Sequence, residues 1–68
     1  MHYVTREVGE GRAVTLFKSA DEGKVRAYYE EMVFTAIDSG AEVGYTGEYF
    51  TYLKHSGMDI VYTLRIDV

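Results

Sequence analysis

The chain has 68 residues with no cysteine and no proline, and its eleven acidic and seven basic side chains give a formal net charge of -4. This length leaves room for one domain with a small core, and the lack of cysteine excludes disulfides and thiolate metal sites as sources of stability. The acidic balance argues against non-specific nucleic-acid binding, because it repels phosphates.

No apolar run approaches the roughly 20 residues that a membrane-spanning helix needs, and residues 1–6 lack the apolar stretch of a signal peptide. We therefore expect a cytoplasmic protein without membrane contact, folded as one domain over residues 1–68. A core this small gains stability from self-association, so we also expect a homodimer.

Residues 3–8 and 12–18 predict a first β-hairpin, joined by a three-residue turn that ends in a left-handed Gly11. The register that this turn sets places Tyr3 and Phe17 on one face. The opposite face is aliphatic and is assigned to the core. Its members are Val4, Val8, Val14 and Leu16.

A capping box formed by Ser19 and Glu22 predicts the start of a helix that ends at Gly40. Apolar side chains recur in this segment at steps of three and four residues, which places them in one stripe that we assign to the core. They are Val25, Tyr28, Tyr29, Met32, Val33, Ala36 and Ile37.

Residues 49–54 and 59–68 predict a second hairpin with Ser56 and Gly57 as its two-residue turn. Residues 41–47 are expected to lead into its first strand, where glycines allow a bulge or bend. The fold class we predict is α+β, an antiparallel ββαββ arrangement of two hairpins with one amphipathic helix on one sheet face.

The register of this second hairpin places apolar and charged side chains on opposite faces. It sets Leu53 against Ile60, Thr51 against Tyr62 and Tyr49 against Leu64 on a largely apolar core face. On the other face it sets Lys54 against Asp59 and Glu48 against Arg65, two pairs of opposite charge.

The sequence offers little for catalysis. His2 lies near the terminus and His55 at a predicted hairpin tip, and neither is placed beside a partner. The segment Gly9-Glu10-Gly11 lacks the third glycine of a dinucleotide loop, and no zinc or calcium ligand spacing is found. We expect neither an enzyme nor a metal or cofactor site.

Two surfaces carry apolar side chains that the predicted fold does not need. On the helix, Phe34 falls almost opposite the core stripe, as an apolar anchor in an acidic border. This predicted partner-binding surface consists of Phe34, Glu30, Glu31, Asp38 and Ala27.

The second surface is the sheet face turned away from the helix, which an antiparallel sheet normally keeps polar. Its rings predict an interface with another copy of the chain. This predicted oligomer interface consists of Phe50, Tyr52, Val61, Tyr3 and Phe17.

The sequence therefore favours a small acidic interaction protein, an inhibitor that occludes a basic and possibly nucleic-acid-binding surface of a partner protein. Small inhibitors of phage or mobile-element origin often share its compact, acidic and linker-free character. Two alternatives stay open. One is a homo-oligomer that binds or sequesters a small ligand, and the other is a nucleic-acid module that stacks bases on the aromatic sheet face.

Overall fold

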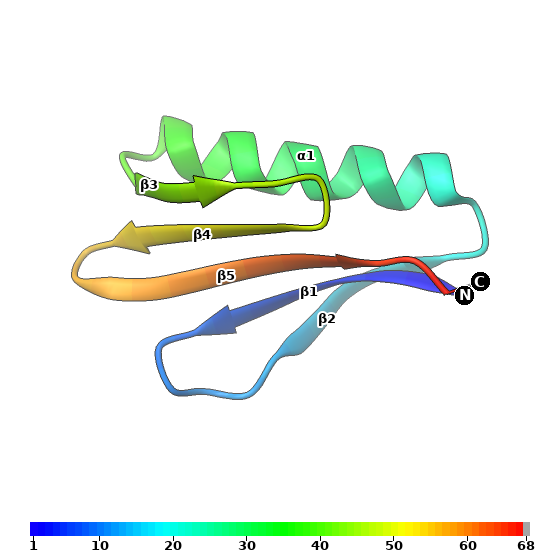
Figure 1. The fold of residues 1–68 in the computed structure, drawn as a ribbon, viewed down its shortest axis with the longest axis horizontal. Coiled ribbons are helices and arrows are strands. Elements are labelled where there is room, and N and C mark those ends of the chain that lie inside the picture. The colour runs from blue at the N-terminus through cyan, green and yellow to red at the C-terminus, as the bar shows by residue number, and fades with distance from the viewer. Residues whose placement is uncertain (68) are drawn as a thin grey trace.

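The computed structural model describes residues 1–67 and shows one open antiparallel sheet with a single helix (Figure 1). The expected α+β class is confirmed, and residues 41–55 form two strands, so the order along the chain is ββαβββ. The elements are β1 (His2–Val8), β2 (Val14–Ser19), α1 (Glu22–Asp38), β3 (Glu42–Thr46), β4 (Phe50–His55) and β5 (Met58–Arg65).

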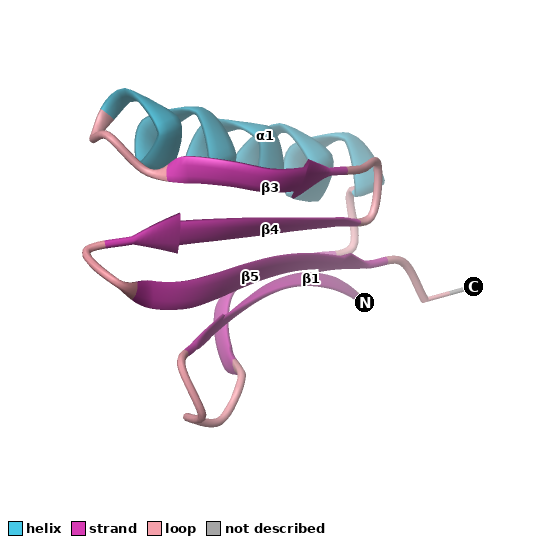
Figure 2. Ribbon diagram, turned by 60° about the vertical axis from the view of Figure 1, so that its left-hand side comes forward, coloured by secondary structure: helices cyan, strands magenta, loops and turns pink. Residues whose placement is uncertain are grey.

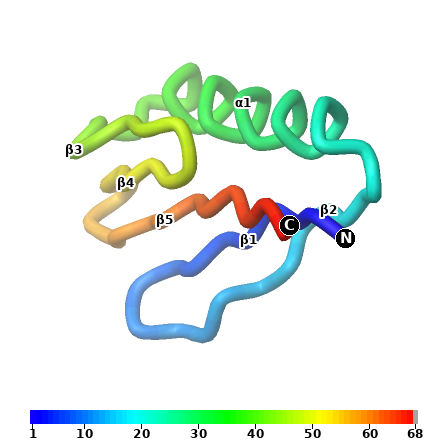
Figure 3. The backbone as a smooth tube through the Cα atoms, turned by 45° about the vertical axis from the view of Figure 1, so that its right-hand side comes forward, coloured from blue at the N-terminus to red at the C-terminus, as the bar shows by residue number. Residues whose placement is uncertain are grey.

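The strands lie across the sheet in the order β2-β1-β5-β4-β3, so β5 is central while β2 and β3 are the two edges. Figure 3 shows the start of β1 and the end of β5 side by side, in agreement with the pairing of Tyr3 with Arg65. The last strand of the chain is therefore inserted between the two hairpins and joins them into one sheet.

The core lies between α1 and one face of the sheet (Figure 2). The helix packs mainly on β5, β1 and β2, and its apolar stripe is buried or half-buried as the spacing predicts. No element within residues 1–67 covers the other face of the sheet. The buried members of the core are Val4, Val25, Tyr29, Val33, Leu53, Tyr62 and Leu64.

The helix begins two residues later than the capping box predicts. Asp21 is the N-cap and its side chain accepts a hydrogen bond of 3.2 Å from the amide of Lys24. Ser19 instead accepts from the amide of Asp21 at 3.0 Å. Both side chains carry an acceptor oxygen, so either could cap the helix. The predicted end is confirmed, because Gly40 adopts a φ of 98° directly after the helix.

The first hairpin contains a bulge that corrects the predicted faces. Thr5 pairs with Thr15, but Val4 pairs with Phe17, so Leu16 is an extra residue in β2. Phe17 therefore turns to the helix side and stacks on Tyr28, with ring centroids 4.7 Å apart. The prediction that Phe17 lies on the outer face is wrong.

Two smaller expectations for the first hairpin also need correction. In its turn, Gly9 with a φ of 59° adopts the left-handed conformation, and Gly11 does not. Val14 is 56% exposed, although its position in the register places it on the helix side of the sheet. It lies on the edge strand near the turn, whereas Val4 on the neighbouring strand is fully buried.

The second hairpin has the predicted register. Leu53 pairs with Ile60 and Lys54 with Asp59, around a turn in which Ser56 and Gly57 both have positive φ. Two positive φ values are the signature of a type I′ turn, whose twist matches that of the strands.

The opposition of Glu48 and Arg65 is wrong. Glu48 lies in the turn between β3 and β4, where its carboxylate is 3.3 Å from the guanidinium of Arg26. Arg65 instead lies over the ring of Tyr3, 5.8 Å from its centroid. The predicted strand was continued through this turn, and the turn changes the direction in which Glu48 points.

Candidate protein-binding surfaces

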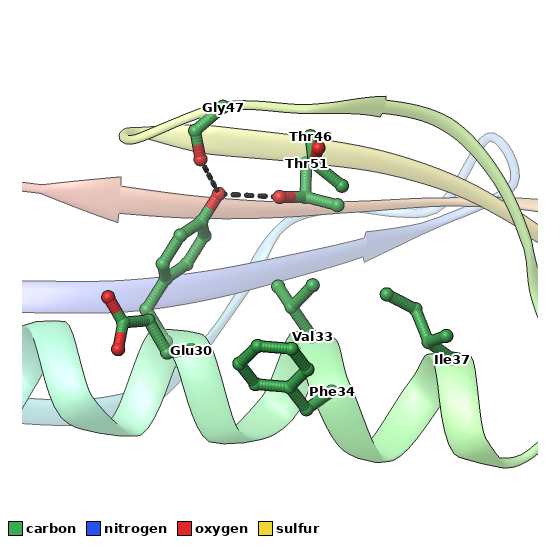
Figure 4. Close-up of a pocket in the computed structure, with 8 residues that line it drawn as sticks. Glu30, Val33, Phe34, Ile37, Thr46, Gly47 and Thr51 are labelled. Atoms are coloured by element: carbon green, nitrogen blue, oxygen red, sulfur yellow. Dashed lines mark hydrogen bonds between the residues drawn. The ribbon is translucent and has the colours of Figure 1, made fainter.

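A groove of about 480 Å³ lies between α1 and the β3–β4 hairpin (Figure 4). It exists because the helix packs mainly on β5, β1 and β2, so that β3 is exposed along its whole length. The groove is lined by Tyr29, Glu30, Val33, Phe34, Ile37, Thr46, Gly47 and Thr51.

Tyr29 connects the helix to the sheet across the groove, through hydrogen bonds to Gly47 and Thr51. Its hydroxyl donates a 2.8 Å hydrogen bond to the carbonyl oxygen of Gly47 and lies 2.6 Å from the hydroxyl oxygen of Thr51. Burial raises the pKa of Tyr29 despite the opposing effect of the Thr51 hydrogen bond. These contacts hold the helix and the β3–β4 turn at a fixed separation.

The structure brings two of the predicted partner-binding residues to the groove. Phe34 is 66% exposed and lines it together with Glu30, beside Val33 and Ile37. The ring of Phe34 thus extends an apolar surface that begins in the core, rather than standing alone on the helix. Ala27, Glu31 and Asp38 are exposed on the helix but do not line the groove.

The carboxylates of this helix differ in their partners. Arg26 makes both ion pairs found within residues 1–67, at 3.5 Å to Glu22 and 3.3 Å to Glu48. The predicted partner-binding carboxylates, Glu30, Glu31 and Asp38, have no basic side chain within ion-pairing distance in this part of the chain. Their negative charge therefore remains available to a partner.

The charge of the chain is also distributed unevenly. Residues 19–50, which include α1, β3 and the β3–β4 turn, carry seven acidic and two basic side chains, a net charge of -5. The remaining residues carry four acidic and five basic side chains, a net charge of +1. The net negative charge of the chain is therefore concentrated in the segment that contains α1 and β3, and of its carboxylates Glu30 lines the groove.

The outer face of the sheet carries a second group of aromatic side chains. Tyr45 of β3 and Phe50 of β4 stack with ring centroids 4.9 Å apart, and they are 52% and 47% exposed. Tyr52 shares this face, and its hydroxyl donates a 2.7 Å hydrogen bond to Asp59. Sequence reasoning missed Tyr45, because it did not separate β3 from β4.

Val61 and Tyr3 occupy the same outer face as predicted, on β5 and β1. Phe17 is absent from it for the reason given above, the bulge at Leu16. The outer face therefore contains four of the five residues that were assigned to an oligomer interface, with Tyr45 in addition.

The histidines have structural contacts. His55 lies at the hairpin end, with Nε2 3.2 Å from the carbonyl oxygen of Ser39, and His2 accepts a 3.1 Å hydrogen bond from the amide of Asp67. Within residues 1–67 no three metal-ligating side chains are grouped to hold an ion. The single helix of this region is too short and too polar to cross a membrane.

Comparison with known proteins gives no assignment, since no protein-family model, no curated protein and no solved structure matches the chain. The groove combines apolar side chains with the unpaired carboxylate of Glu30, and the outer face combines stacked rings with hydrogen-bonded polar groups.

Proposed function

We propose that this chain is a non-enzymatic interaction protein that binds a basic surface of a partner protein through the groove between α1 and β3. The partner surface is then covered and loses access to its other ligands, which makes the chain an inhibitor by occlusion. A partner whose basic surface handles nucleic acid fits this proposal, because carboxylates can occupy positions that phosphates would otherwise take.

One observation carries the proposal, the position of exposed Phe34 beside Glu30 along an apolar groove. An aromatic anchor with a polar border is the usual arrangement of a binding hot spot. The net charge of -5 over residues 19–50 adds attraction at longer range, which increases the rate of encounter with a basic partner.

The test begins with cross-linking of the wild-type chain to its partner in extracts of the organism that encodes it, followed by measurement of Kd with the purified partner. Phe34→Ala should weaken binding at least about fivefold, mainly through faster dissociation. The matched control is Met58→Ala, which shortens an exposed apolar side chain at the β4–β5 turn and should leave Kd unchanged.

The second part of the test reverses the charge of two neighbouring carboxylates on the helix. Reversal of Glu30 and Glu31 to lysine should slow association and reduce its dependence on salt, because the attraction to the basic partner is lost. Glu10→Lys in the turn between β1 and β2 is the control. Unchanged binding by the Phe34 and glutamate variants would contradict the proposal.

A second candidate function is the binding of a small ligand, and the size of the groove favours it. Its volume of about 480 Å³ falls within the range of roughly 300 to 1,000 Å³ that small-molecule sites occupy. A ligand bound there should raise the melting temperature, and Phe34→Ala should remove that shift. A screen of small molecules by thermal denaturation separates this candidate from protein binding.

A further inference from the structure

The outer face of the sheet has an apolar centre that no part of residues 1–67 covers. The pairing of Phe50 with Thr63 and of Tyr52 with Val61 places these four side chains together across β4 and β5. Tyr45 extends the centre onto β3, where it stacks on Phe50. An uncovered aromatic centre of this kind is typical of a protein interface.

The charged side chains of this face are separated along the strands. Three acidic groups and one basic group occupy the half next to the β4–β5 turn, a net charge of -2. They are Glu7, Glu42, Lys54 and Asp59. The opposite half carries Arg65 and Lys18, both at the level of Tyr3, with Asp67 beside Tyr3 and Lys18, a net side-chain charge of +1.

We propose that a second copy of the chain covers this face in a two-fold symmetric dimer whose strands run opposite to those of the first copy. The axis crosses the middle of β5, the central strand, at the level of residue 62. Arg65 of each subunit then faces Asp59 of the partner subunit. The apolar centre of one copy covers the apolar centre of the other.

Charge selects this orientation over the other face-to-face arrangement. A two-fold axis parallel to β5 would bring Asp59 against Asp59 of the partner subunit and Arg65 against Arg65 of the partner subunit. Like charges placed opposite each other disfavour association. With the strands reversed, each acidic half meets a basic half, so the face is complementary to itself as an isologous interface requires.

A standard interface covers about 800 Å² of each partner, which is roughly a sixth of the 4592 Å² surface of this chain. Because the groove lies on the helix side of the sheet, the dimer leaves both grooves free. The proposal therefore does not depend on the proposed function.

Sedimentation velocity over a range of concentrations provides the test. The wild-type chain should sediment at twice the 7.7 kDa mass of one chain. Asp59→Arg and Arg65→Asp should each weaken dimerisation about 100-fold or more, because each converts two symmetry-related ion pairs into like-charge contacts. Circular dichroism should show that both variants remain folded.

Mixing the two variant proteins, or combining the two substitutions in one chain, makes the test specific. An equimolar mixture of the Asp59→Arg and Arg65→Asp proteins should form a mixed dimer, and the double variant should dimerise by itself, because opposite charges face each other again. The matched controls Glu10→Arg and Arg12→Asp reverse charges in the β1–β2 turn region and should sediment like the wild type.

If the wild-type chain stayed monomeric up to about 1 mM, the affinity between two copies would be too weak to matter, and the proposal would be overturned. A dimer that both single variants leave intact would overturn it equally, since its interface would lie elsewhere. Loss of dimer in the singles without recovery in the mixture would also reject the strand-reversed arrangement.

Discussion

The hydroxyl oxygen of Tyr29 lies 2.6 Å from that of Thr51 and 2.8 Å from the carbonyl oxygen of Gly47. A tyrosine hydroxyl has one proton. Since that proton goes to the carbonyl of Gly47, Thr51 donates to Tyr29. One phenol thus connects α1 with β4 and with the chain segment that leaves β3.

Tyr29→Phe should lower the free energy of unfolding by about 1 to 3 kcal/mol, because the Thr51 hydroxyl stays buried without its acceptor. Thr51→Val should also destabilise, but the double variant should lose less than the sum of the two single losses. Urea denaturation measures all three, with Tyr45→Phe on the exposed face as a nearly silent control. Strictly additive losses would show that the two hydroxyls do not act as a pair.

The same phenol makes stability depend on alkaline pH. Burial favours the neutral form and raises the pKa of Tyr29 in the folded state above its ordinary value of about 10. The folded state therefore keeps its proton when the unfolded chain has released it. The contribution is complete below about pH 10 and is lost as the pH rises through the folded-state value.

Stability measured by urea denaturation from about pH 8 to 11 should thus fall at the alkaline end, and Tyr29→Phe should make that fall shallower. Some decline should persist in the variant, because a hydrogen bond to Asp59 raises the pKa of Tyr52 as well. Equal slopes in the two proteins would assign the alkaline loss to other groups.

Two valines of the first hairpin allow a matched test of the core. Val4 is fully buried and Val14 is 56% exposed, on adjacent strands. Val4→Ala should cost about 2 to 3 kcal/mol from lost burial and the cavity left behind, whereas Val14→Ala should cost less than about 0.5 kcal/mol. Chemical denaturation of the two variants measures the difference, and similar losses would contradict the observed difference in burial between the two valines.

The ring of Tyr52 leaves no room for a side chain at position 44. A β-carbon added at this bulge position would lie 2.7 Å from Cε2 of Tyr52, so Gly44→Ala should destabilise by about 1 to 3 kcal/mol. In a Tyr52→Ala background the same change should be nearly neutral, because the obstructing ring is gone. A cost that persists in that background would show that the backbone, and not the ring, requires glycine.

Much of the fold follows from sequence where two patterns agree. In the second hairpin the apolar face and the Lys54–Asp59 pair both require one register, so an alternative would lose them together. The helix stripe is equally well determined by its spacing. The first hairpin has no such second pattern. The extra residue Leu16 moves the side chains beyond it in β2 to the opposite face of the sheet, which is why the prediction placed Phe17 on the wrong face.

The groove could be predicted only in part. Phe34 and Glu30 were identified by their angle on the helix, but that angle does not say which strands the helix covers. The placement of α1 over β5, β1 and β2 is a tertiary property that depends on packing of the whole core. Thr46 and Gly47 line the groove because the helix leaves β3 uncovered, and the sequence pattern does not predict that placement.

Both edge strands of the sheet contain a bulge, at Leu16 in β2 and at Gly44 in β3. A regular edge strand presents evenly spaced amides and carbonyls on which another molecule can continue the ladder, and this is how fibres grow. A bulge interrupts that spacing and increases the local twist. The two irregularities thus disfavour polymerisation of this small, aromatic-rich chain through its edges, whereas the proposed dimer through the outer face would be a closed assembly to which no further copy adds.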